Sequence, residues 1–282
     1  TQVSVGSNPT LSAHKVPTNR LGPCRMRRCI GEAATRARST VSHPTPRRSL
    51  TRSSTGPGRY PSHMSRVIAV SGAVGGIGTS TFAYALALHA APTGTLIDAR
   101  RSGVPLELLI GGESEPGTRW HQIHVTSAAI DAETIRSALP KWNDVLFLSA
   151  NRLGSVRSPA LAHIVDALRQ GSADVVVDVD ARSSLIDTIH PDLHVLVVPN
   201  TIYGLGAAVP ALRKNTSLLV VRTQLEDFRP DEISRYLSQP VLGVIQHERS
   251  VWMALRARKA LPTDSSVMRS AALLVARTAD AA

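Results

Sequence analysis

Cysteine is nearly absent from this chain of 282 residues, and its two cysteines, Cys24 and Cys29, both lie near the beginning. Residues 64–282 have none, so neither a disulfide framework nor a cysteine-based zinc site can support their fold. No apolar run reaches the length of about 18 residues that a transmembrane helix requires. Residues 64–282 are nevertheless long enough to bury one α/β core.

Residues 64–282 also lack an excess of charge of one sign. Residues 1–63 hold 11 of the 32 Lys and Arg residues but one of the 21 acidic residues, Glu32, which leaves 21 basic and 20 acidic residues in the rest. Non-specific binding to nucleic acid relies on a basic surface that neutralises phosphates. The net charge of +1 therefore argues against a nucleic-acid-binding role for residues 64–282.

Residues 1–63 lack sustained apolar periodicity and are rich in Arg, Ser, Thr and Pro. Such a segment buries too little apolar surface to offset its ordering entropy, so we predict a disordered basic segment. Three interpretations are open: a basic arm for nucleic acid or anionic lipid, an organellar transit peptide, or an over-extended reading frame. We favour the last, a mis-assigned start, because the chain does not begin with Met and Met64 directly precedes the first predicted strand. Residues 64–282 are then the one folded domain.

Apolar strands alternate with helical stretches from Arg66 onward. Continuous Val, Ile and Leu runs are typical of a parallel sheet that is covered on both faces. Leu161 and Leu168 bound an i, i+3, i+4, i+7 helical pattern, and Pro230 followed by two acids begins another helix. The alternation predicts a doubly wound, mostly parallel α/β sheet with helices on both faces, which binds ligands at the C-terminal ends of its strands. The predicted strands are 66–71, 94–98, 145–149, 174–180, 194–198, 217–222 and 241–245.

A glycine-rich loop follows the first predicted strand. Residues 73–81 read AVGGIGTST, and a helix-like run from Phe82 to His89 follows them. Between a strand and a helix, glycines let successive backbone N–H groups point at an anion, and the helix N-terminus adds partial positive charge. A turn that packs the helix on the strand without a ligand is the alternative. We predict a phosphate-binding loop for a nucleotide, formed by Gly75, Gly76, Ile77, Gly78, Thr79, Ser80 and Thr81.

Two acids follow apolar runs of predicted strands. Asp178 follows the apolar run 175–177, which is the arrangement of a Walker B carboxylate that orients Mg²⁺ through water. Ser80 is placed to bring its hydroxyl to the same ion. Asp98 ends the second predicted strand and is a further candidate for the metal, because the C-terminal ends of parallel strands share one edge of a sheet. An ordinary acid at a strand end is the alternative for each, and no residue is assigned a catalytic role.

Together these residues resemble the MinD/ParA group of deviant Walker ATPases. Within it, the likeness is greatest to the CpaE/TadZ-like proteins of Tad pilus and secretion loci, which are also labelled septum-site-determining proteins. The ordered set of motifs is more specific than any one member. It extends from Val67 to Ala276 and comprises the loop 73–81, the segment 96–111, Trp120, and the segments 145–149, 176–178, 195–199, 219–222 and 241–243.

The chain departs from that family at the positions that carry charge. Active members have a Lys-Gly-Gly-x-Gly-Lys-Ser/Thr loop, and here Val74 and Thr79 stand at the two lysine positions. The second acid of the family's Asp-x-Asp motif is Arg100, and Arg222 stands at the position of an Asn that contacts the base. One lost charge-assisted hydrogen bond costs about 1.5–3 kcal/mol, whereas a cation on the transition-state phosphate is worth roughly 10³ or more in rate. The resemblance thus implies a pseudo-ATPase that binds ATP or ADP with Mg²⁺ weakly or has lost nucleotide binding. From their position alone, Arg100 and Arg101 are candidates for a substitute cation.

The resemblance also implies a role for the chain. The leading interpretation is a positioning or scaffold factor for pilus or secretion machinery or for septum placement. The alternatives are an active ATPase of Tad pilus assembly or septum-site determination, and a DNA-partitioning protein of ParA type. The family forms homodimers, engages proteins of those machineries and is cytoplasmic, with no specific nucleic acid expected here. Residues 266–282 form either a helix packed on the domain or a peripheral contact with the inner face of the membrane.

Overall fold

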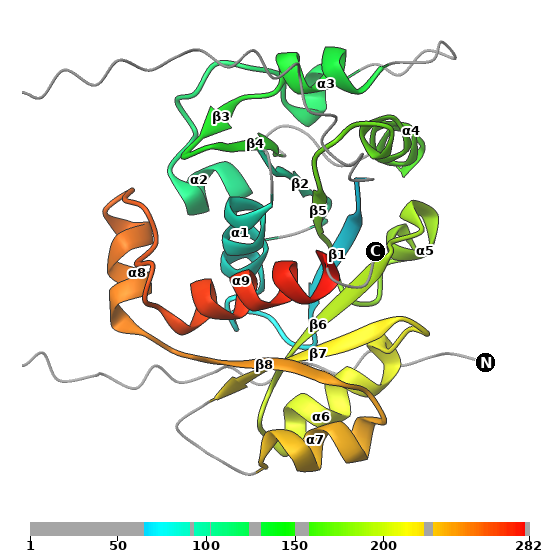
Figure 1. Cartoon of the computed structure of the whole chain (residues 1–282), viewed down its shortest axis with the longest axis vertical. Helices are drawn as coiled ribbons and strands as arrows, with labels where there is room; N and C mark the ends of the chain where they lie inside the picture. The colour runs from blue at the N-terminus through cyan, green and yellow to red at the C-terminus, as the bar shows by residue number, and fades with distance from the viewer. Residues whose placement is uncertain are drawn as a thin grey trace, which may run out of the picture. The chain divides into compact units, whose positions relative to one another are not determined.

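The computed structural model describes residues 65–90, 93–101, 103–123, 131–149, 158–222 and 228–279. All described residues belong to the second of the two units into which the chain divides, Pro57–Ala282. The predictions for residues 1–63 therefore lie outside the described residues. In the second unit, strands and helices alternate along the chain (Figure 1).

An eight-stranded sheet forms the centre of this unit, with the order β3-β4-β2-β5-β1-β6-β7-β8. All neighbouring strands are parallel except β3 and β4, which are antiparallel. The seven predicted strands are confirmed, whereas β3 was missed because two residues are too few to show a periodic pattern. The strands are β1 (Val67–Gly72), β2 (Thr95–Asp98), β3 (Lys141–Trp142), β4 (Val145–Leu148), β5 (Val175–Asp178), β6 (Leu193–Pro199), β7 (Thr216–Arg222) and β8 (Val241–Gln246).

Helices cover both faces of the sheet, which confirms the doubly wound fold. One face packs against α1, α2, α8 and α9, and the other packs against α4 and α5 at one end and α6 and α7 at the other. Single-turn 3₁₀ helices lie at Trp120–Gln122 and Val209–Ala211. The α-helices are α1 (Thr79–His89), α2 (Leu106–Ile110), α3 (Ala132–Ala138), α4 (Ser158–Arg169), α5 (Leu185–Ile189), α6 (Ile202–Ala208), α7 (Pro230–Leu237), α8 (Arg249–Arg256) and α9 (Ser266–Ala279).

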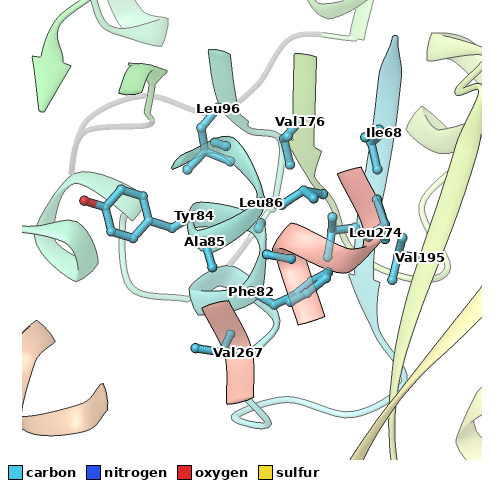
Figure 2. Packing of buried hydrophobic residues seen from close by; sticks show 14 of the residues in the cluster. Ile68, Phe82, Tyr84, Ala85, Leu86, Leu96, Val176, Val195, Val267 and Leu274 are labelled. Atoms are coloured by element: carbon cyan, nitrogen blue, oxygen red, sulfur yellow. The ribbon is translucent and has the colours of Figure 1, made fainter. Parts of the chain in front are cut away.

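Helix α1 is buried between the sheet and α9. Every side chain from Phe82 to Ala87 is buried, so this helix has no polar face in its middle turns. Figure 2 shows Leu86 of α1 between Val176 of β5 and Leu274 of α9. Burial on all sides holds α1 in a fixed position relative to β1, and therefore also fixes the loop that joins them.

The C-terminal helix α9 packs on the domain. Its residues Val267, Met268, Ala271 and Leu274 are buried against the same core as α1. The apolar face that would have docked on a membrane is thus covered by protein, which supports the first of the two interpretations of this segment. Among the described residues, no helix combines the length and the apolar character that spanning a membrane requires. Peripheral contact with a membrane stays a prediction.

His194 is a buried histidine between β1 and β7. It lies on β6 with 1% of its surface exposed, and its ring nitrogens share hydrogen bonds with the hydroxyls of Ser71 (2.7 Å) and Thr216 (2.9 Å). Burial and then the charge of Arg213 lower the pKa of His194 from 6.5 to about 4, against the opposing charge of Asp187. The histidine is therefore neutral in the folded protein at neutral pH.

We expect His194 to make the stability depend on pH between pH 6.5 and pH 4. The unfolded chain binds one more proton than the folded chain in this interval, so the free energy of unfolding falls with falling pH, by up to about 3 kcal/mol. Urea unfolding at both ends of the interval measures this loss. The loss should shrink by that amount in His194→Gln and persist in the control His190→Asn, since His190 is exposed. An equal loss of stability in both variants would contradict the assignment of this pH dependence to His194.

Candidate functional site

The C-terminal ends of three neighbouring strands meet at one edge of the sheet. In the parallel pairing of β5 with β1 and β2, Asp178 lies opposite Val70 on one side and opposite Asp98 on the other. The glycine-rich loop, residues 73–78, leaves β1 at this edge and enters α1. The structure thus brings together the loop and both acids that the sequence singled out.

The loop has a backbone conformation that requires glycine. Gly76 and Gly78 have φ angles of +76° and +89°, in the left-handed region that strains other residues. A Cβ added at Gly75, Gly76 or Gly78 would meet no atom within 4 Å, so these positions face open space. No side chain caps the N-terminus of α1, and its first turn has no acid. The first N–H groups of the helix therefore remain for an anionic ligand or for water.

Thr79, at the lysine position, lies close to the loop's own backbone. A Cβ added at Gly72 would collide with Oγ1 of Thr79, which shows that this hydroxyl packs against the end of β1. The Thr79 side chain is short and neutral and cannot carry charge across the loop to a bound phosphate, as a lysine does.

A cavity of about 840 Å³ opens in front of the loop. Cofactor and ligand sites typically enclose about 300–1,000 Å³. Ile77 does not line the cavity and packs partly buried against the core instead. Arg182, an exposed residue after β5, lines the cavity and was missed because nothing in the local sequence distinguishes it from a solvated arginine. The other lining residues include Gly75, Gly76, Gly78, Thr79, Ser80, Thr81, Arg100, Asp178 and Asp180.

Arg222 does not lie in this cavity. It ends β7 and lines a separate cavity of about 90 Å³ with Asn200 and Phe228. The resemblance places Arg222 at the position where the family contacts a nucleotide base. This volume is well below that of a typical ligand site.

Arg100 joins the two acids at the strand ends. Its Nε lies 3.0 Å from Oδ1 of Asp98 and 3.0 Å from Oδ2 of Asp178. Its Nη2 donates to Oδ2 of Asp98 at 3.0 Å and to the carbonyl oxygen of Val104 at 2.9 Å. Asp98 and Asp178 are 2% and 0% exposed. The guanidinium is thus clamped between two buried carboxylates.

Burial and charge act in opposite directions on this cluster. Burial raises the pKa of Asp178 to about 6, while the charge of Arg100 and the neighbouring Ser80 hydroxyl hold it from rising further. Burial lowers the pKa of Arg100, but the charges of Asp178 and Asp98 outweigh that effect and raise it above its ordinary value. At neutral pH the cluster therefore consists of ionised Asp178 and its charged partner Arg100.

The comparison by sequence finds curated relatives that match the chain over part of their length. No family model matches the chain. The "Uncharacterized protein Rv3660c" of Mycobacterium tuberculosis (strain H37Rv) is 32% identical over 189 residues, which are 63% of this chain and 53% of that protein. "Uncharacterized protein MT3760" of the strain CDC 1551 has the same values. The chain thus spans about half the length of the curated relatives that it matches.

Solved structures share the fold described above. A ParA family ATPase from Chlorobium tepidum TLS superposes with a TM-score of 0.64 and 14% identity, over 75% of this chain and 97% of that chain. The chain has the MinD/ParA P-loop fold. The MinC:MinD cell division protein complex of Aquifex aeolicus gives 0.60 and 18% identity, over 75% and 96% of the two chains. MinD complexed with Mg-ADP from Pyrococcus horikoshii OT3 gives 0.56 and 15% identity, over 76% and 96%.

The MinD/ParA-like fold implies a Mg²⁺ position, and the residues here fit it poorly. Ser80 and Asp178 both line the cavity, and Asp98 is adjacent to Asp178, so the predicted metal residues do lie together. However, the Arg100 guanidinium already lies 3.0 Å from both carboxylates. Within the described ranges, no group of three His, Cys, Asp or Glu residues could hold a metal ion. A divalent cation would have to displace Arg100 before it could bind both carboxylates at once, because Arg100 contacts both oxygens of Asp98 and Oδ2 of Asp178. Oδ1 of Asp178 lies outside these contacts and has no hydrogen-bond partner among the described residues.

Proposed function

We propose that this protein is a degenerate nucleotide-binding protein of MinD/ParA type with weak or no ATP hydrolysis. The observation that carries the proposal is the loop between β1 and α1. It opens uncapped backbone N–H groups onto a cavity of about 840 Å³ but has no lysine. Backbone amides at a helix N-terminus suffice to hold phosphate groups of ATP or ADP. Without the lysine charge, affinity falls by roughly ten- to a hundredfold.

We further propose that the protein acts as a homodimeric positioning or scaffold factor of the CpaE/TadZ-like kind, for pilus or secretion machinery or for septum placement. The motif set supports this, as does the solved complex in which a protein of this fold, MinD, is bound to MinC. A protein that binds its partner in one nucleotide state needs no rapid turnover. The alternative is an active ATPase of pilus assembly or septum-site determination, and the retention of Ser80 and Asp178 at the cavity favours it.

Replacement of Gly78 by Ala is expected to weaken the binding of ADP by at least about tenfold, because a Cβ would stand in the open space of the loop and strain its backbone. Isothermal titration of the full chain measures this. Gly111→Ala is a control for the backbone strain alone, since Gly111 has a φ angle of +87° against +89° for Gly78 but does not line the cavity. A Cβ at Gly111 would also lie 3.0 Å from the Arg258 side chain, so this variant is at least as strained as Gly78→Ala. Equal affinity in both variants and the wild type would contradict the placement of the phosphates.

A further inference from the structure

Arg100 lies between Asp98 and Asp178, the two acids that the sequence predicts for Mg²⁺. Its Nε is equidistant, at 3.0 Å, from carboxylates on two neighbouring strands, β2 and β5. Both strands end at these acids, and Asp98 and Asp178 lie opposite each other in register. Two buried carboxylates this close repel each other unless a cation lies between them. The guanidinium is that cation.

The surroundings hold Arg100 rigidly in this place. The backbone N–H groups of Arg100 and Leu106 both donate to the carboxylate of Asp98, at 3.2 and 3.1 Å. The indole N–H of buried Trp120 donates to the carbonyl oxygen of Asp98 at 2.7 Å, which fixes the end of β2. A guanidinium with three hydrogen bonds to preorganised acceptors loses little further freedom when a ligand arrives.

One nitrogen of Arg100 remains available. Its Nε and Nη2 are engaged by Asp98, Asp178 and the carbonyl of Val104, whereas Nη1 donates to none of the described residues. Arg100 lines the cavity in front of the loop, and 17% of its side chain is exposed. A guanidinium N–H is a strong donor to phosphate oxygen. Arg100 can therefore bind both carboxylates and reach a phosphate.

We propose that Arg100 is a resident cation that replaces Mg²⁺, so that the cavity binds the phosphates of a nucleotide without a divalent metal. This inference rests on the proposed nucleotide binding. It differs from a substitute for the missing lysines, because the guanidinium is fixed on the metal side of the site, at Asp98 and Asp178, and not across the glycine loop. It also accounts for an Arg at the position where the family's motif has its second acid.

Titration of ADP into the full chain, with Mg²⁺ and with EDTA, tests the inference directly. We expect dissociation constants that agree within about twofold, since no metal contributes to the contact. Binding that is at least about tenfold tighter with Mg²⁺ would overturn the resident cation and leave the proposed nucleotide binding intact. Absence of ADP binding under both conditions would instead contradict the proposed function. The Mn²⁺ experiment below would then decide whether Arg100 occupies the place of a divalent cation.

Binding of Mn²⁺ to the nucleotide-free chain, followed by electron paramagnetic resonance, is the second experiment. Mn²⁺ bound at this site is identified by its loss when Asp178→Asn is introduced. The wild type and the control Arg101→Gln should bind no such ion. Arg101 is exposed and does not line the cavity. Arg100→Gln should gain one such ion, because it frees both carboxylates. The inference would be overturned if the wild type bound Mn²⁺ and Asp178→Asn removed it. It would also be overturned if Arg100→Gln folded but bound no additional Mn²⁺. If Arg100→Gln does not fold, the wild-type result alone decides.

Discussion

Arg100→Gln is expected to lower the free energy of unfolding by about 3–5 kcal/mol at neutral pH. The substitution leaves the carboxylates of Asp98 and Asp178 buried opposite each other without the cation that now lies 3.0 Å from each. Removal of one partner from a buried ion pair costs far more than removal of both, because an uncompensated charge remains in a medium of low dielectric constant. Urea unfolding of the full chain measures the change.

The asymmetry of the cluster makes this prediction specific. Asp178→Asn should cost much less than Arg100→Gln, since Arg100 retains Asp98 and since burial already disfavours the ionised form of Asp178, as its raised pKa shows. The double variant should be more stable than Arg100→Gln alone, as a double-mutant cycle would reveal. The control Arg101→Gln, at an exposed neighbour, should change stability by no more than about 0.5 kcal/mol. Equal effects of Arg100→Gln and Arg101→Gln would contradict a stabilising role for the cluster.

The rate of phosphate release from ATP is expected to be at least about 10³-fold lower than that of a lysine-bearing MinD or ParA protein assayed in parallel. Neither lysine position of the loop carries a cation, and Thr79 packs back on the end of β1. A bound nucleotide would contact amides that position its phosphates but would lack the mobile charge that stabilises the transition state. A sensitive phosphate-release assay on the full chain with Mg²⁺ measures the rate.

A contaminating ATPase is the main hazard of that assay. Gly78→Ala, purified in the same way, provides the background, because the substitution strains the loop that would hold the nucleotide. The wild type should release phosphate no faster than this variant. Turnover at the rate of the lysine-bearing protein, abolished in Gly78→Ala, would overturn the pseudo-ATPase and favour an active ATPase.

The order of elements could be read from the sequence because apolar runs and glycines have local physical causes. The run before Asp178 and the loop 73–81 follow from backbone preferences that need no distant partner. The two-residue strand β3 could not be found in this way. The burial of α9 was open, because the same apolar stripe suits a protein core and a membrane surface.

The candidate site likewise has features that can be read from the sequence and features that depend on the fold. The presence of a glycine-rich loop without lysines could be read from the chain alone, since this depends only on which residues follow one another. The position of Arg100 between Asp98 and Asp178 could not be read in this way, because the parallel register of β2 and β5 brings together acids from distant parts of the chain. Ion pairing at such a strand edge depends on distances between neighbouring strands, and these exist only once the sheet has formed.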